Sequence, residues 1–143
     1  MNAPADPVYR EEFLVPPEAV DTNGHVNNVV YVQWMQDVAV RHSDAVGGTR
    51  ALHDAGGRWV VRSHHVEYLA PAFSGDRLRV ATWVTGFRRV RTLRRYRFER
   101  AADGQVLARG ETDWVFVDAG TGRPRTIPEG LRMLFPLCLE PAL

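Results

Sequence analysis

The chain has 143 residues, which suits one domain that can bury roughly 70% of its unfolded surface without disulfide bonds. Its hydrophobic share of 45% and charged share of 24% are those of an ordinary globular protein and exclude disorder on a large scale. The formal net charge is +1 with Arg as every basic residue, and the single Cys138 excludes an intramolecular disulfide or a multi-cysteine metal site.

The N-terminal part of the chain is predicted to hold a short strand and one long helix. Residues 1–8 lack the apolar segment of a secretory signal, and we expect them to form a disordered leader. The apolar content of residues 9–15 favours a strand, which two prolines end. Between residues 28 and 46 apolar side chains recur near helical spacing, and their number predicts a helix that is largely enclosed. Two glycines end this helix, and a flexible connection with room for one short helical turn is expected up to residue 57.

The rest of the chain changes to the spacing of strands. Four strands separated by short turns are predicted, at residues 59–69, 77–87, 92–100 and 106–118. Short connections between consecutive strands favour an antiparallel meander. A proline at the start of residues 128–135 predicts a short closing helix there.

These elements define an α+β domain over residues 9–136, in which an antiparallel sheet covers one long buried helix, with a C-terminal tail at 137–143. One helix cannot cover a sheet of that size, so we expect self-association. No run approaches the roughly 18 apolar residues of a membrane span. A cytoplasmic protein with no membrane insertion is therefore expected.

Residues 20–31 gather a carboxylate, an imidazole and several amides just ahead of the long helix. Asp21, Asn23 and Gly24 are turn formers, and Asn27 or Asn28 can cap the helix. The unpaired N–H groups and the positive dipole end of a helix attract an anion or a polarised carbonyl oxygen. These residues therefore fit a reactive site, and they fit equally well a turn and a cap that only satisfy local hydrogen bonds.

The run from Asp21 to Asn28, read D-T-N-G-H-V-N-N and followed by Tyr31 and Trp34, resembles the hotdog-fold thioesterases of the 4-hydroxybenzoyl-CoA thioesterase type. It is also similar to the D-x-N-x-H-V-N-N-V signature of plant acyl-ACP thioesterases and bacterial long-chain acyl-CoA thioesterases. The resemblance implies a sheet wrapped around a central helix, homodimers that often pair into homotetramers, and active sites at the dimer interface. It also implies hydrolysis of acyl-CoA or acyl-carrier thioesters. We expect no cofactor and no metal.

The resemblance further implies a role for each residue of this motif. Asp21 corresponds to the family's base or nucleophile, and the N–H near Asn28, together with Gly24, would hold the thioester oxygen. Asn23 and His25 correspond to polar residues of the acyl-ACP branch and could orient a water molecule. Tyr31, in the first turn of the helix, is a candidate for contact with the substrate.

One departure from the plant enzymes affects the catalytic residues. Those enzymes carry further polar catalytic residues just after the strand that ends near residue 69, where this chain has Pro71 and Ala72. Glu67 shares a strand face with His65 and is an outside candidate for a second carboxylate, although a cross-strand pair with an Arg also explains it. Adjacent His64 and His65 point to opposite faces of a strand, which argues against a metal site.

An arginine-rich stretch covers residues 88–100. Arg88, Arg89 and Arg91 fall in the turn between two predicted strands and could bind coenzyme A phosphates or an acidic carrier protein. Plain surface charge explains them equally well.

Three other functions compete with thioester hydrolysis. A hotdog dehydratase or hydratase would carry a different signature, and a non-catalytic acyl-CoA sensor would bind without turnover. A nucleic-acid partner is not expected, because no aromatic stacking platform extends beyond Tyr96 and Phe98. The length of the preferred acyl chain, and the choice between coenzyme A and a carrier protein as the substrate's thiol, depend on the volume of the pocket.

Overall fold

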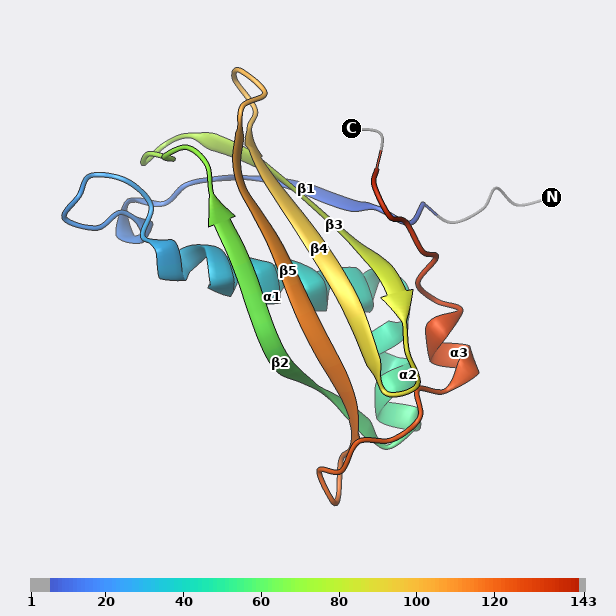
Figure 1. Cartoon of the computed structure of the whole chain (residues 1–143). Helices are drawn as coiled ribbons and strands as arrows, with labels where there is room; N and C mark the ends of the chain where they lie inside the picture. The colour runs from blue at the N-terminus through green and yellow to red at the C-terminus, as the bar shows by residue number, and fades with distance from the viewer. Residues whose placement is uncertain (1–5, 142–143) are drawn as a thin grey trace.

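An antiparallel sheet lies across one long helix in the computed structural model, which describes residues 6–141 (Figure 1). The five strands of the described chain are β1 (Tyr9–Leu14), β2 (Gly57–Tyr68), β3 (Arg77–Phe87), β4 (Arg91–Arg100) and β5 (Val106–Asp118). The helices are α1 (Asn28–Ala45), α2 (Gly48–Asp54) and α3 (Glu129–Arg132), with a single 3-10 turn at Pro17–Ala19. The α+β class and the one long helix expected from the sequence are confirmed.

The order of strands in the sheet is β1-β3-β4-β5-β2, with every neighbouring pair antiparallel. The expected meander holds for β3, β4 and β5, but it is wrong for β2, which lies at the far edge beside β5. The connection after β2 is too long for a tight hairpin. Instead the N–H groups of Leu69 and Ala70 bond to the Leu107 carbonyl of β5 as the chain crosses towards β3.

One face of α1 packs on the sheet. Its buried residues follow helical spacing and are Tyr31, Met35, Val38, Ala39 and His42. Gly110 of β5 makes room for Met35, because a Cβ atom there would lie 2.7 Å from the Met35 sulfur. The opposite face carries Val29 and Val40, which are 73% and 54% exposed. The helix is therefore enclosed on one face only, and the expectation of a largely enclosed helix is wrong for a single chain.

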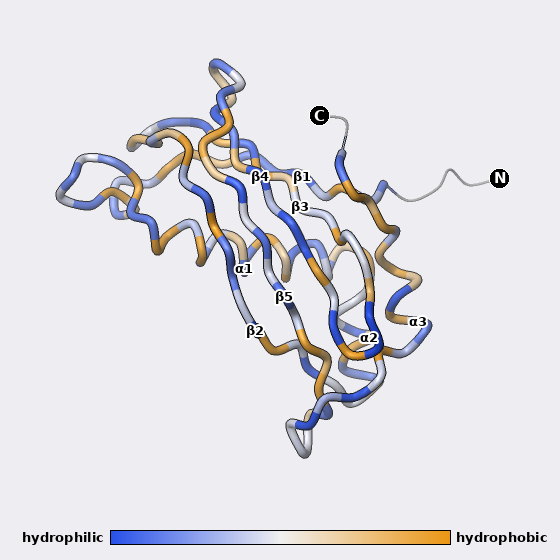
Figure 2. The backbone as a smooth tube through the Cα atoms, viewed as in Figure 1, coloured by the Kyte–Doolittle hydropathy of each residue, from blue (hydrophilic) through white to orange (hydrophobic). Residues whose placement is uncertain are grey.

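Hydrophobic and hydrophilic positions alternate around α1 and along the strands (Figure 2). In β4, the side chains of Thr92, Arg94, Tyr96 and Phe98 are buried on the helix side. The intervening arginines lie on the other face, where Arg95 pairs with Glu111 at 3.0 Å. The arginine-rich stretch is thus divided between the two faces, and Arg94 is the member buried in the core.

A second hydrophobic cluster closes the end of the molecule where α1 ends. It contains Val84, Phe116, Ile127, Leu131 and Phe135, and α2 packs against it. After α1 the chain forms a seven-residue helix, where a flexible connection with room for one short helical turn was expected. The closing helix is α3, and its four residues are fewer than the predicted eight.

The predicted leader and the predicted C-terminal tail are only partly described. Residues 1–5 of the predicted leader lie outside the described residues, and Val8, its last residue, is buried. In the predicted tail, the Cys138 N–H bonds to the Val84 carbonyl at 3.0 Å. Within residues 6–141, no helix has the length and apolar character required to cross a membrane.

Candidate functional site

The loop before α1 is a tight turn built around Asp21. One carboxylate oxygen of Asp21 accepts the Asn23 N–H at 2.8 Å, and the Asp21 carbonyl accepts the Gly24 N–H at 3.0 Å. Gly24 has φ of +84°, a left-handed conformation that favours glycine. These bonds fix the carboxylate in an Asx turn. The second carboxylate oxygen makes no hydrogen bond to the described part of the chain.

The loop is held to the rest of the fold by its backbone. The Val26 N–H bonds to the Ala72 carbonyl at 2.8 Å, and the Asn27 N–H bonds to the Ala19 carbonyl at 3.0 Å. Val26 and Ala72 are both buried. Ala72 therefore packs below the loop and anchors it through its carbonyl.

Asn27 is the residue that caps α1. Its side-chain oxygen accepts the Val29 N–H at 3.0 Å, and its carbonyl accepts the Val30 N–H at 3.0 Å. Between these, the Asn28 N–H has no acceptor among residues 6–141. This N–H lies at the positive end of the helix dipole.

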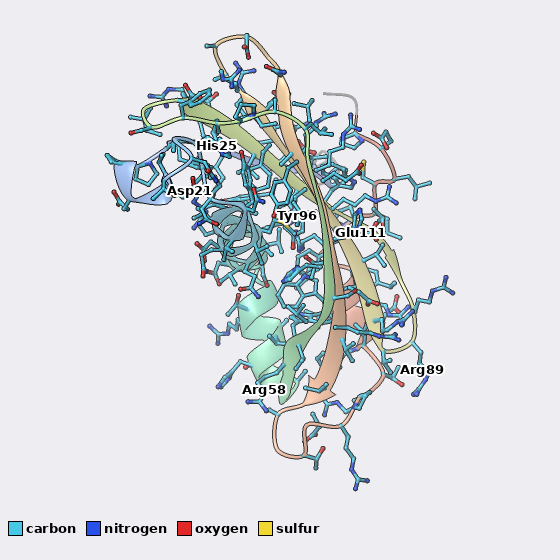
Figure 3. The ribbon with its side chains drawn as sticks, turned by 60° about the vertical axis from the view of Figure 1, so that its left-hand side comes forward. Asp21, His25, Arg58, Arg89, Tyr96 and Glu111 are labelled. Carbon is cyan, nitrogen blue, oxygen red and sulfur yellow. The ribbon has the colours of Figure 1, made fainter. Side chains whose placement is uncertain are left out.

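Asn23 and His25 occupy the same loop. Asn23 is exposed at the turn, and the His25 Nδ1 lies 3.3 Å from the Val26 carbonyl. Figure 3 shows Asp21 and His25 close to the N-terminal end of α1. The structure therefore places Asp21, Asn23, Gly24 and His25 in one loop, which leads directly into Asn28 at the start of α1.

Tyr68 contacts the candidate site, and the sequence analysis did not single it out. Its hydroxyl, at the end of β2, donates to the Asn28 carbonyl at 2.8 Å, which ties the first turn of α1 to the sheet. Tyr68 directly follows Glu67 in the sequence, but no local pattern indicated its contact with residue 28. Register places the neighbouring Glu67 opposite Arg109 of β5, in line with the expected cross-strand pairing.

Tyr31 lies beneath this turn in an aromatic cluster. Its ring makes edge contacts with Trp34, Tyr68 and Phe98 at centroid distances of 5.2 to 5.6 Å. The hydroxyl is buried and has no hydrogen-bond partner among the described residues. Burial raises the pKa of Tyr31 to about 12, so its proton is retained. Tyr31 supports the floor of the site.

The three arginines proposed for phosphate contact lie elsewhere in the single chain. Figure 3 shows Arg89 at the opposite end of the sheet from Asp21. Arg89 donates to Thr126 at 2.9 Å, Arg91 pairs with Asp113 at 3.6 Å, and the Arg88 carbonyl accepts from Arg132. Within one chain these arginines do not join the Asp21 loop.

An apolar cavity of about 280 Å³ is a second feature that the sequence analysis missed. It lies between the C-terminal half of α1, α2 and the sheet, and Arg94 forms part of its wall. The period of β4 put Arg94 on the same face as Tyr96 and Phe98, and that alternation was the signal available in the sequence.

An antiparallel sheet that covers one long helix, with a polar turn at the helix N-terminus, defines a hotdog-fold domain. The chain belongs to the thioesterase-like superfamily, whose family model matches residues 15–135.

Comparisons with individual proteins agree with this assignment. The chain is 28% identical over 135 residues to oleoyl-acyl carrier protein thioesterase 2 of Arabidopsis thaliana, covering 87% of this chain and 36% of that protein. It thus spans about a third of that relative's length. An acyl-ACP thioesterase of Bacteroides thetaiotaomicron has a similar structure, with a TM-score of 0.85 and 23% identity over 94% of this chain and 54% of that one. The structure of a 1,4-dihydroxy-2-naphthoyl-CoA thioesterase of Synechocystis is also similar, with a TM-score of 0.80 and 20% identity. That match covers 90% of this chain and 95% of the other.

Proposed function

We propose that the protein hydrolyses acyl thioesters, of coenzyme A or of an acyl-carrier protein, to a carboxylic acid and a thiol. The observation that carries the proposal is that one short loop, which leads into α1, holds both the Asp21 carboxylate and the free N–H of Asn28 at its end. The superfamily match and the thioesterase names of the similar proteins support the reaction class.

The proposed chemistry needs a base or nucleophile and a donor for the developing oxyanion. General base catalysis contributes roughly two to four powers of ten, and one good oxyanion donor roughly two to three. Asp21 serves as the base for a water molecule or as the nucleophile itself. The Asn28 N–H and the dipole of α1 stabilise the negative charge on the thioester oxygen. Asn23 and His25 orient the water.

We further propose that two chains join through the free edge of β2. Within residues 6–141, this 12-residue strand pairs with β5 alone, and its other edge is left without a partner. A long free edge is a template for pairing with a second strand. Antiparallel pairing of two β2 edges would join the two sheets into one in a homodimer. It would also bring the exposed Val29 and Val40 closer to the partner chain. A homotetramer would pair two such dimers.

This dimer would also give the arginine turn a role. Antiparallel edges set the Asp21 end of one chain level with the opposite end of its partner, where Arg88, Arg89 and Arg91 lie. The proposal assigns these arginines to the phosphates of coenzyme A or to an acidic carrier surface. Arg88 is exposed and forms no side-chain ion pair with the described residues, so it is the most available of the three.

The test is release of free thiol from a panel of acyl-CoA and acyl-carrier substrates by the wild type and by Asp21→Asn. Asn keeps an oxygen for the Asn23 N–H and so preserves the turn, while it removes the charge. We expect a loss of roughly two to four powers of ten in kcat/KM. Asp54→Asn, a change of the same kind on the exposed end of α2, should leave the activity unchanged.

Two outcomes would contradict the proposal. Full activity in Asp21→Asn would remove Asp21 from the reaction. Tight binding of acyl-CoA without turnover by the wild type would identify a sensor instead of an enzyme.

A further inference from the structure

Arg94 is a buried charge without a carboxylate partner in the described chain. Its side chain is 6% exposed. Nη1 donates to the His42 Nδ1 at 2.8 Å and to the Thr82 Oγ1 at 3.1 Å. No ion pair joins Arg94 to any acidic residue within residues 6–141, and Nε and Nη2 make no hydrogen bond there. A buried charge is costly unless it is paired. The groups that face this guanidinium are two neutral acceptors and the Phe135 ring, whose centroid lies 5.7 Å from Cζ.

The cavity described above borders this guanidinium. Its walls are mainly aromatic and aliphatic and include Leu52, Trp59, Val84, Phe87, Trp114 and Phe135. Its other charged residue is Arg58, which is exposed and lies beside α2 at the start of β2 (Figure 3). None of the residues that line it is acidic. The cavity therefore combines an apolar interior with positive charge alone.

We propose that this cavity binds a carboxylate carried on a small apolar body, with the carboxylate seated on Arg94. The planar fork of an arginine fits the two oxygens of a carboxylate, and Nε and Nη2 form one edge of that fork. Apolar cavities of about 150 Å³ already accept a benzene ring. The volume of about 280 Å³ therefore accommodates an aromatic ring or a medium-length chain together with its carboxylate.

The walls favour a carboxylate over a phosphate. A phosphate presents more charge and more acceptor oxygens, which need several donors. Arg94 is the one buried charged group among the described residues that line the cavity, and the neutral polar residues of the lining are Ser43, Thr49 and Thr92. A ligand with a single negative charge on an apolar body matches one buried arginine in an apolar cavity.

Two sources could supply such a carboxylate. A free carboxylic acid could bind as a separate ligand. An acyl group that ends in a second carboxylate could also reach the cavity, and this second source rests on the proposed thioesterase function and on the β2 dimer. The experiment distinguishes the two sources.

The first measurement is calorimetric titration of the full-length wild type with octanoate and benzoate, each compared with its uncharged alcohol, octanol or benzyl alcohol. We expect the acids to bind at least about tenfold more tightly than the alcohols. Arg94→Met should weaken binding of the acids by roughly ten- to a hundredfold, the loss typical of one charged hydrogen-bonding partner, and leave the alcohols unaffected. These titrations need no turnover, so they remain valid if the protein proves inactive.

Two further variants separate loss of the binding site from loss of folding. Arg95→Met makes the same change one residue along β4, on the opposite face, and should leave acid binding unchanged. Leu52→Trp fills the cavity while Arg94 stays, and it should abolish binding of acids and alcohols alike. Equal affinity for acids and alcohols, or unchanged acid binding in either Arg94→Met or Leu52→Trp, would overturn the proposal.

The second measurement identifies the source. Thioesters whose acyl chain ends in a carboxylate are compared with thioesters of equal length that end in a methyl group. A lower KM for the carboxylate series, lost in Arg94→Met, assigns the site to the acyl group. Acid binding without such a preference assigns it to a free acid, and either result supports a carboxylate site.

Discussion

His42 of α1 accepts a hydrogen bond from Arg94 of β4, with 2.8 Å between Nδ1 and Nη1. Because a guanidinium only donates, the Nδ1 of His42 must carry no proton. Tyr9 stacks on the ring at 5.3 Å and Phe135 meets it edge-on. Burial first, and then the charge of Arg94, lower the pKa of His42 from 6.5 to about 4.

This relationship predicts that stability falls in mild acid. Below pH 6.5 the unfolded chain takes up a proton at residue 42 that the folded chain refuses until about pH 4. The unfolded state then binds more protons, so the free energy of unfolding falls as the pH falls through this window, by about 3 kcal/mol in all. Urea unfolding at half-unit steps of pH measures this slope.

Two variants isolate the contribution of His42. His42→Gln removes the titrating group, and the difference between its slope and that of the wild type should vanish above pH 6.5. His53→Gln, at an exposed position of α2, should keep the wild-type slope. An equal slope for His42→Gln and the wild type would show that His42 is not held neutral.

Gly57 at the start of β2 should tolerate no side chain. A Cβ atom there would lie 2.3 Å from the ring of Phe116, which is fully buried. We expect Gly57→Ala to lower the free energy of unfolding by about 1–3 kcal/mol, as overpacking of a core does. Thermal unfolding compares it with Gly130→Ala in α3, where no atom lies within 4 Å and no loss is expected. Equal stability of the two variants would contradict this account of the contact.

The cap of α1 should contribute to stability independently of catalysis. Asn27→Ala removes the acceptor of the Val29 N–H and should cost roughly 0.5–2 kcal/mol, whereas Asn27→Ser keeps a capping oxygen and most of the stability. Denaturant midpoints measure both changes. If Asn27→Ala unfolds at the wild-type midpoint, the cap has no energetic role.

The hydrogen bond from Tyr68 to Asn28 should orient the proposed oxyanion donor. Tyr68→Phe removes this bond at an exposed position and should cost less than about 1 kcal/mol of stability. We expect kcat to fall several-fold with KM nearly unchanged, because the first turn of α1 is held less firmly. Tyr9→Phe, which breaks a bond to Glu11, is the matched control and should retain full activity. Equal kcat in both variants would remove Tyr68 from the site.

Local features of the site could be predicted because they depend on neighbours in the chain. The Asx turn of Asp21, the left-handed Gly24 and the cap by Asn27 are each made within three residues. The sequence left Asn27 and Asn28 as alternative caps, and the hydrogen bonds assign the cap to Asn27. The thioesterase family was likewise predicted from the resemblance of this one loop, and the superfamily model matches residues 15–135.

Features that join distant segments could not be predicted in the same way. Tyr68 reaches Asn28 across 40 residues, and Arg94 reaches His42 across 52. The arginine-rich stretch was left open between phosphate or carrier contact and surface charge. Neither interpretation placed Arg94 in the core, because composition does not say which face of a strand is covered. Burial of Arg94 follows only when α1 lies across that face of β4.

By itself, the sequence determined the strands, the long helix and the polar loop that begins it, because periodicity and turn chemistry act between close neighbours. Its residues 77–87 and 106–118 match β3 and β5 to the residue. Only the tertiary structure decided that β2 lies at the far edge, that one face of α1 remains open and that Arg94 borders a cavity. These depend on which apolar faces are buried against each other, a competition between distant segments that no local pattern records.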